Sequence, residues 1–102
     1  MSELISLKTL TADTFEPYVN TTFQLKRTDD SDSPVTLTQL SRYSMVSNSG
    51  RQQFSLVFVG TPGEVLPQHI YPLHHPDLGA LDLFLVPIGV CPEGTRYEAV
   101  FT

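Results

Sequence analysis

The chain has 102 residues, of which 40% are hydrophobic and 10% aromatic, and its formal net charge is −5. This length fits one domain, predicted to span residues 1–102, and the apolar content excludes a disordered segment. Basic residues are few and only Lys26 and Arg27 are adjacent, so the charge pattern argues against a nucleic-acid-binding surface.

The only cysteine, Cys91, excludes an intramolecular disulfide. Residues 1–8 lack a basic region followed by an apolar one, which argues against a secretory signal peptide. No apolar stretch approaches the ~20 residues that a membrane helix needs. We therefore expect a cytoplasmic protein with no membrane partner, although export by a route that reads no N-terminal signal stays open.

The first predicted element is a short helix within residues 9–19. Thr11 is a favourable N-cap residue. Pro17 limits the helix to about two or three turns, because its ring clashes in a longer one. Three apolar residues recur at helical spacing and share one face: Ala12, Phe15 and Val19.

Most of the remaining chain alternates between apolar and polar residues, as half-buried strands do. Strands are predicted in six segments: 20–27, 35–45, 53–60, 69–75, 80–88 and 96–102. We expect a bulge near Gln39–Leu40 and a hairpin turn at Asn48–Gly50. The sequence therefore predicts an all-β, mainly antiparallel fold, a small barrel or sandwich of about six strands with one short N-terminal helix.

Both faces of the later strands are apolar. One face supplies a core: Phe54, Leu56, Phe58, Leu81, Leu83, Leu85, Tyr97, Ala99 and Phe101. A solvated antiparallel face is normally polar, yet the opposite face carries Val57, Val59, Phe84, Val86 and Val100. Either the helix or loop 60–68 covers this second set, or a partner does. For the second case the candidate interface is Val57, Val59, Phe84 and Val86.

Histidines form the one cluster that resembles a metal site, His69, His74 and His75 with Asp77. Neighbouring side chains on a strand point to opposite faces, so His74 and His75 are poorly placed to share an ion. We expect no metal here. His75 is predicted to orient the turn at 76–79 by donating a ring N–H to a backbone carbonyl.

No other pattern predicts catalysis. Cys91 has no histidine or acid at a spacing typical of a catalytic thiol. The acidic segment 29–32 lacks the glycine and the distant glutamate of a calcium loop. The acids Glu64, Glu93 and Glu98 follow no pattern that predicts a catalytic pair. We expect no catalytic residue, no cofactor and no enzymatic activity.

Four segments carry a family resemblance: Phe54–Gly60, Gln68–Gly79, Leu83–Gly89 and Tyr97–Phe101. The most specific pieces are Leu-Phe-Leu-Val-Pro and Tyr-Glu-Ala-Val-Phe. With them the chain resembles a family of small uncharacterised bacterial β proteins, a domain of unknown function. Its members resemble products encoded near phage-tail-like collar proteins. The resemblance implies a shared scaffold and carries over no catalytic residue, and this chain departs from it in its acidic loop and in Thr102.

These observations predict a non-enzymatic protein-interaction or assembly accessory module that associates with itself or with a phage-tail-like or tail-fibre-like protein. The contact would bury the candidate interface or pair through the edge of strand 20–27. The alternative is a small-ligand-binding domain or hydrolase with a pocket at one barrel end, lined by His69, Tyr71 and loop 60–68.

Overall fold

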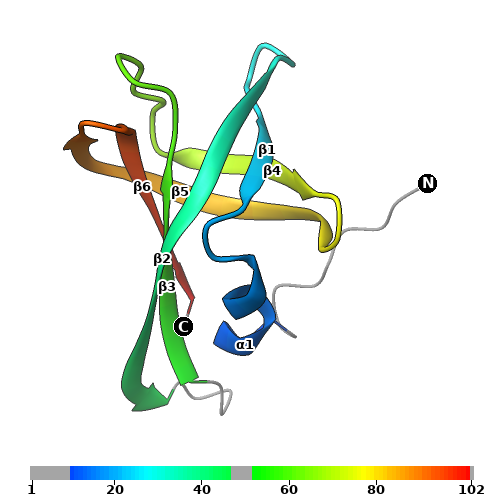
Figure 1. Ribbon diagram of the computed structural model, residues 1–102, viewed down its shortest axis with the longest axis vertical. Coiled ribbons are helices and arrows are strands. Elements are labelled where there is room, and N and C mark those ends of the chain that lie inside the picture. Colours follow the sequence, from blue (N-terminus) through cyan, green and yellow to red (C-terminus); the bar gives the residue numbers. More distant parts are fainter. Residues whose placement is uncertain (1–9, 47–51, 102) are drawn as a thin grey trace.

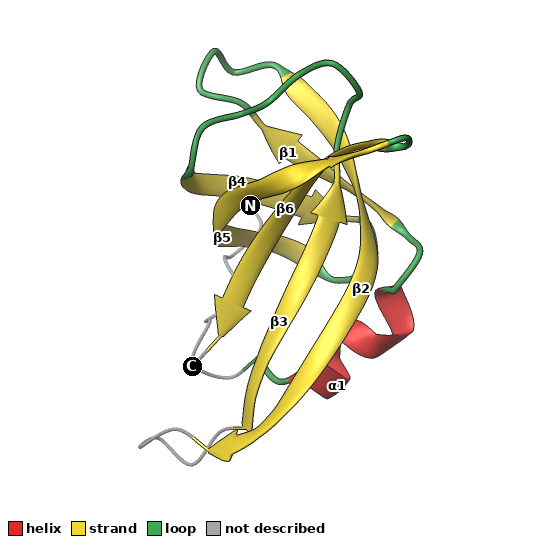
Figure 2. Cartoon of the chain, turned by 90° about the vertical axis from the view of Figure 1, so that its left-hand side faces the viewer, coloured by secondary structure: helices red, strands yellow, loops and turns green. Residues whose placement is uncertain are grey.

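The computed structural model describes residues 10–46 and 52–101, so the N-terminal segment 1–9 and the hairpin turn predicted at Asn48–Gly50 lie outside the described residues. The described strands are β1 Thr22–Lys26, β2 Asp32–Val46, β3 Gln52–Val59, β4 His69–His75, β5 Gly79–Cys91 and β6 Gly94–Phe101. All are antiparallel, and their order β1-β2-β3-β6-β5-β4 closes into a barrel (Figures 1 and 2). The predicted all-β fold is confirmed.

The predicted N-terminal helix is also present. Helix α1 (Ala12–Phe15) continues into a 3₁₀ turn, η2 (Glu16–Tyr18), with Thr11 at the N-cap position. The backbone N–H of Thr11 donates to Thr14 Oγ1 at 3.2 Å, which partners a group at the helix start. Pro17 lies at the beginning of the turn, where its missing N–H costs nothing. No helix in the described residues is long and apolar enough to cross a membrane.

The helix closes one end of the barrel. Phe15 is fully buried, and its ring centroid lies 6.0 Å from that of Phe54 and 5.7 Å from that of Phe101. Both partners belong to the core face of the sheet. The helix therefore packs onto the core. It does not cover the outer face that carries Phe84, although the sequence left open that the helix would do so.

The loop at residues 60–68 closes the other end. Leu66 is 8% exposed, and its backbone N–H donates to the Tyr97 hydroxyl at 2.9 Å. The Tyr71 hydroxyl in turn donates to the Pro67 carbonyl at 2.6 Å. Between the two ends, buried apolar side chains of all six described strands form one continuous core.

Strand β1 is paired on both of its edges. Its residues pair with β2 from Thr22↔Thr36 to Lys26↔Asp32, and Gln24 and Leu25 pair with β4. The segment 20–27 is thus not a free edge strand. The prediction that a partner could pair with the edge of this strand is therefore wrong. The reason is barrel closure, which removes sheet edges.

Candidate functional site

Three exposed apolar side chains lie on the outward faces of β4, β5 and β6, and two of them are register neighbours. Ile70 of β4 pairs with Phe84 of β5. The pairing of β5 with β6 ends at Val86 and Glu98, so Phe84 and Val100 both face outward just beyond the paired part of the two strands. Ile70, Phe84 and Val100 are 57%, 51% and 59% exposed. We call these three residues the outer row.

The four interface residues proposed from sequence lie on the outward faces of β3 and β5, where Glu98 of β6 pairs with both Val57 and Val86. Phe84 is exposed and Val86, on the same face of β5, is half-buried. Val57 is only 6% exposed, so it offers little area to a partner. Val59 is half-buried and lines a separate pocket. Of the four, Phe84 is the one that exposes a large part of its apolar side chain.

Ile70 and Val100 were not among the proposed interface residues. Residues 69–75 alternate with Tyr71, Leu73 and His75 buried, which places Ile70 outward. The same alternation of side chains can be recognised in the sequence, and it could have identified Ile70 as an outward residue. The sequence does not give the strand register, which is what brings Ile70 beside Phe84.

Charged groups flank the outer row. Asp82 precedes Phe84 by two residues and Glu98 precedes Val100 by two, so each acid lies on the same outward face as its neighbour, and both are half-buried. At the β4 end of the row, Ile70 borders a hollow of about 270 Å³ that is also lined by Lys26 and Arg27. The guanidinium of Arg27 is paired with Glu64 at 2.7 Å. Because Glu98 pairs with Val86, the two acids lie on opposite sides of Phe84 along the strands, and the basic residues lie beside Ile70.

The histidines separate as strand geometry predicts, since His74 is exposed and His75 is 4% exposed. His75 does orient the turn that follows it, but by the opposite polarity from the one predicted. Its Nδ1 accepts the backbone N–H groups of Asp77 at 3.1 Å and Leu78 at 3.4 Å. The ring hydrogen therefore lies on Nε2, 3.1 Å from Thr21 Oγ1. His75 tethers the β4–β5 turn to the segment before β1.

The hollow beside Ile70 includes part of the pocket predicted for the alternative function. His69 and Tyr71 both line it, whereas loop 60–68 does not. That loop fills the barrel end, where Leu66 and the Tyr71 hydroxyl are held by hydrogen bonds. Among the described residues, no group of three or more His, Cys, Asp or Glu side chains is placed to hold a metal ion.

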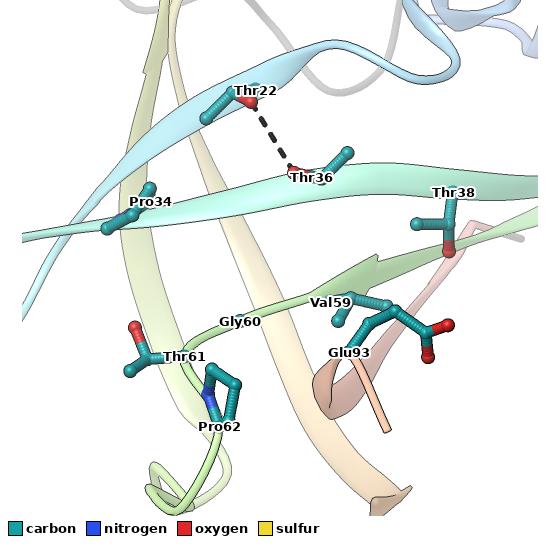
Figure 3. Close-up of a pocket in the computed structure, with 9 residues that line it drawn as sticks. All are labelled: Thr22, Pro34, Thr36, Thr38, Val59, Gly60, Thr61, Pro62 and Glu93. Atoms are coloured by element: carbon teal, nitrogen blue, oxygen red, sulfur yellow. Dashed lines mark hydrogen bonds between the residues drawn. The ribbon is translucent and has the colours of Figure 1, made fainter. Parts of the chain in front are cut away.

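A second pocket, of about 400 Å³, lies on the outer face of β1, β2 and β3 (Figure 3). Thr22, Thr36 and Val59 are register neighbours there, and the hydroxyls of the two threonines lie 3.4 Å apart. Further residues complete the lining: Pro34, Thr38, Gly60, Thr61, Pro62 and Glu93. We call it the threonine pocket. Its lining comes from four separate stretches of the chain, which is why sequence reasoning missed it.

The contact between loop 60–68 and the β5–β6 turn fixes Glu93 at this pocket. Gly60 N–H donates to the Thr95 carbonyl at 2.8 Å, and the Thr95 hydroxyl donates to the Glu64 carbonyl at 2.6 Å. Thr95 is 1% exposed. The turn that carries Glu93 is therefore tied to the loop that forms the pocket wall.

The fold and its surface define a small closed antiparallel barrel with a filled interior and an exposed apolar row. The chain belongs to the family described as Domain of unknown function (DUF6916), whose model matches residues 10–101. Neither a curated protein nor a solved structure matches the chain significantly.

Proposed function

We propose that the chain is a non-enzymatic protein-interaction or assembly module whose outer row contacts another polypeptide. The observation that carries the proposal is the pairing of Ile70 with Phe84, both more than half exposed, with the exposed Val100 on the next strand. Full burial of one such side chain is worth about 1.5–3 kcal/mol. Contiguous apolar patches of this kind on soluble proteins commonly mark contact sites.

The closed sheet favours a contact made by side chains. Because β1 pairs with both β2 and β4, the barrel offers a partner no long free edge there. Two acids near Phe84, Asp82 and Glu98, and the basic Lys26 near Ile70 would orient the partner by charge. The partner would meet the row with apolar side chains at the centre of the contact.

The finer proposal is that the partner is a phage-tail-like or tail-fibre-like protein in a bacterium. It rests on the resemblance of segments such as Leu83–Gly89 and Tyr97–Phe101 to products encoded near phage-tail-like collar proteins. A second copy of this chain is the other occupant to be measured.

The test compares Phe84→Asp with Val65→Asp. Val65 is 60% exposed but lies in loop 60–68, away from the outer row, so its variant controls for the added charge. Light scattering of the pure protein measures self-association, and co-purification with a tail-fibre-like protein measures a heterologous contact. Loss of either association in Phe84→Asp alone is the expected result. Equal association of all three proteins, or a monomer that binds nothing, would discard the proposal.

A second candidate function is the binding of a small ligand in the hollow lined by His69, Tyr71 and Lys26. Its volume of about 270 Å³ is near the lower end of ligand pockets, roughly 300–1,000 Å³. A thermal-shift screen with metals and sugars tests it, because a ligand that binds the folded state raises the midpoint of unfolding.

A further inference from the structure

We propose that the threonine pocket binds the side chain of a lysine from a partner polypeptide. This goes beyond the function proposed above, because the pocket lies on β1, β2 and β3, whereas the outer row lies on β4, β5 and β6. The pocket volume of about 400 Å³ is within the range of ligand sites, roughly 300–1,000 Å³. It is large enough to admit a side chain together with part of its backbone.

The charge of the pocket selects a cation. Among the described residues that line it, Glu93 is the one that carries a charge. Its carboxylate lies at one end of the pocket, beside Thr38 and Val59, and Pro34 and Pro62 lie toward the other end (Figure 3). The whole chain has a net charge of −5, which adds a general attraction for positive groups.

The remaining lining suits an aliphatic stem. Pro34, Pro62 and Val59 present apolar surface, and lysine buries its methylene groups on such surface while its ammonium stays near water. Thr38 lies at the Glu93 end of the pocket (Figure 3), and its hydroxyl donates to the Val57 carbonyl at 3.3 Å, so this oxygen keeps lone pairs that accept from an ammonium. One end of the ligand would thus contact Glu93 while its stem crosses the pocket.

Lysine fits this arrangement better than arginine. A guanidinium is a planar fork that prefers a two-bond contact with one carboxylate. An ammonium is a compact charge with three donors that rotate, so it suits one carboxylate and scattered hydroxyls. The pocket offers the second pattern, since Glu93 is its one carboxylate among the described lining residues and Thr38 lies at the same end (Figure 3).

The site is also held before any ligand arrives. The hydrogen bonds from Gly60 to Thr95 and from Thr95 to Glu64 fix the β5–β6 turn against the loop, and Glu93 is part of that turn. A pre-formed site loses less conformational entropy on binding. This increases the affinity available from a single side chain.

The experiment is an NMR titration of the ¹⁵N-labelled full chain with N-acetyl-lysine N-methylamide. The matched ligand is N-acetyl-norleucine N-methylamide, which keeps the aliphatic stem and lacks the ammonium. We expect saturable shifts at the amides of Thr36, Val59, Gly60 and Thr61, with the lysine ligand binding more tightly. In Glu93→Gln we expect lysine affinity about two- to fivefold lower, close to that of norleucine, as for an exposed ion pair.

Glu16→Gln is the control variant, since Glu16 lies in η2 outside the pocket lining. It should bind both ligands as the parent chain does. Three results would overturn the proposal: shifts that fall elsewhere on the barrel, equal affinity of the two ligands for the parent chain, or an unchanged lysine preference in Glu93→Gln. None of these results tests the proposal for the outer row, because the effect of Phe84→Asp is measured as association with a protein.

Discussion

Gly94 lies so close to the carbonyl oxygen of Gly60 that a Cβ atom at position 94 would overlap that oxygen. The φ angle of Gly94 is 150°, which side chains disfavour. Next to this contact, the Gly60 N–H donates to the Thr95 carbonyl at 2.8 Å. The two glycines thus join the β5–β6 turn to the loop that closes the barrel, and the same junction places Glu93 at the threonine pocket.

Alanine substitutions at two glycines should separate backbone strain from steric overlap. Gly89 has a φ of 146°, close to that of Gly94, but a Cβ there meets nothing within 4 Å. We expect Gly89→Ala to cost about 1–3 kcal/mol from strain alone. Gly94→Ala should cost at least about 1 kcal/mol more, from the overlap with Gly60. Urea unfolding measures both values, and equal costs would show that the close approach is unimportant.

The acceptor role of His75 predicts a difference between Asn and Ala at this position. The Oδ1 atom of His75→Asn can accept the N–H groups of Asp77 and Leu78 in place of Nδ1. His75→Ala leaves both groups without that acceptor, and it should be less stable than His75→Asn by about 1–3 kcal/mol.

Both variants lose the ring contacts of His75 with Tyr18 and Phe23, each at a centroid distance of 4.7 Å, so this loss cancels in the comparison. Hydrogen exchange at the amides of Asp77 and Leu78 provides the specific readout. Protection should persist in His75→Asn and fall in His75→Ala. Equal exchange in both variants would contradict the acceptor role.

Tyr71 predicts a loss of stability at alkaline pH. Burial, with a smaller contribution from neighbouring Tyr97, raises the pKa of the Tyr71 hydroxyl above its ordinary value of 10.0, against an opposing effect of Arg27. The folded state therefore holds the proton more tightly than the unfolded state. This tighter binding of the proton stabilises the folded state. The stabilisation is fully present below the ordinary pKa, and it is lost as the pH rises from there through the folded-state pKa.

The measurement is the unfolding midpoint of the parent chain and of Tyr71→Phe from neutral to alkaline pH. At neutral pH, Tyr71→Phe should be less stable by about 1 kcal/mol, because it removes the hydrogen bond to Pro67. The difference in stability between the two proteins should shrink as the pH rises above the ordinary pKa of the tyrosine hydroxyl. A difference that stays constant would contradict the pKa direction.

Phe15 predicts that the short helix is essential to the core. Its ring is fully buried against Phe54 and Phe101. Phe15→Ala should destabilise the chain by about 3–5 kcal/mol, because it leaves a cavity at the barrel end. Phe15→Leu keeps most of the volume and should cost clearly less. Calorimetric midpoints of the two variants check this, and a negligible effect of Phe15→Ala would mean that the helix only rests on the barrel.

Several elements were predictable because their signals are local. Thr11 and Pro17 bound the helix, and alternation gave β4 its observed limits, His69–His75. The limits of other strands depended on the strands with which they pair. Strand β2 begins at Asp32, before its predicted start, because Asp32 pairs with Lys26 across the hairpin. The register shift in β2 falls between Leu37 and Gln39, just before the bulge predicted near Gln39–Leu40.

The threonine pocket was less accessible to sequence reasoning. Thr22, Thr36 and Val59 read as ordinary outward residues of three strands, and Glu93 as an isolated acid in a turn. Their proximity follows from two strand registers and from the contact of Gly94 with Gly60. A contact between backbone atoms that are far apart in the sequence produces no residue pattern that a single sequence could show, other than the two glycines.

By itself, the sequence determined the alternating strands, the short capped helix and the surplus of apolar outward residues, because each follows from the spacing of neighbouring residues. The tertiary structure alone decided which outward residues are exposed. Val57 and Val100 both face outward on adjacent strands, yet they are 6% and 59% exposed. The long side chains of Gln39 and Glu98 lie opposite Val57, whereas the small Ser55 lies opposite Val100. Exposure thus depends on the residues that the register places alongside, which one strand's own sequence does not specify.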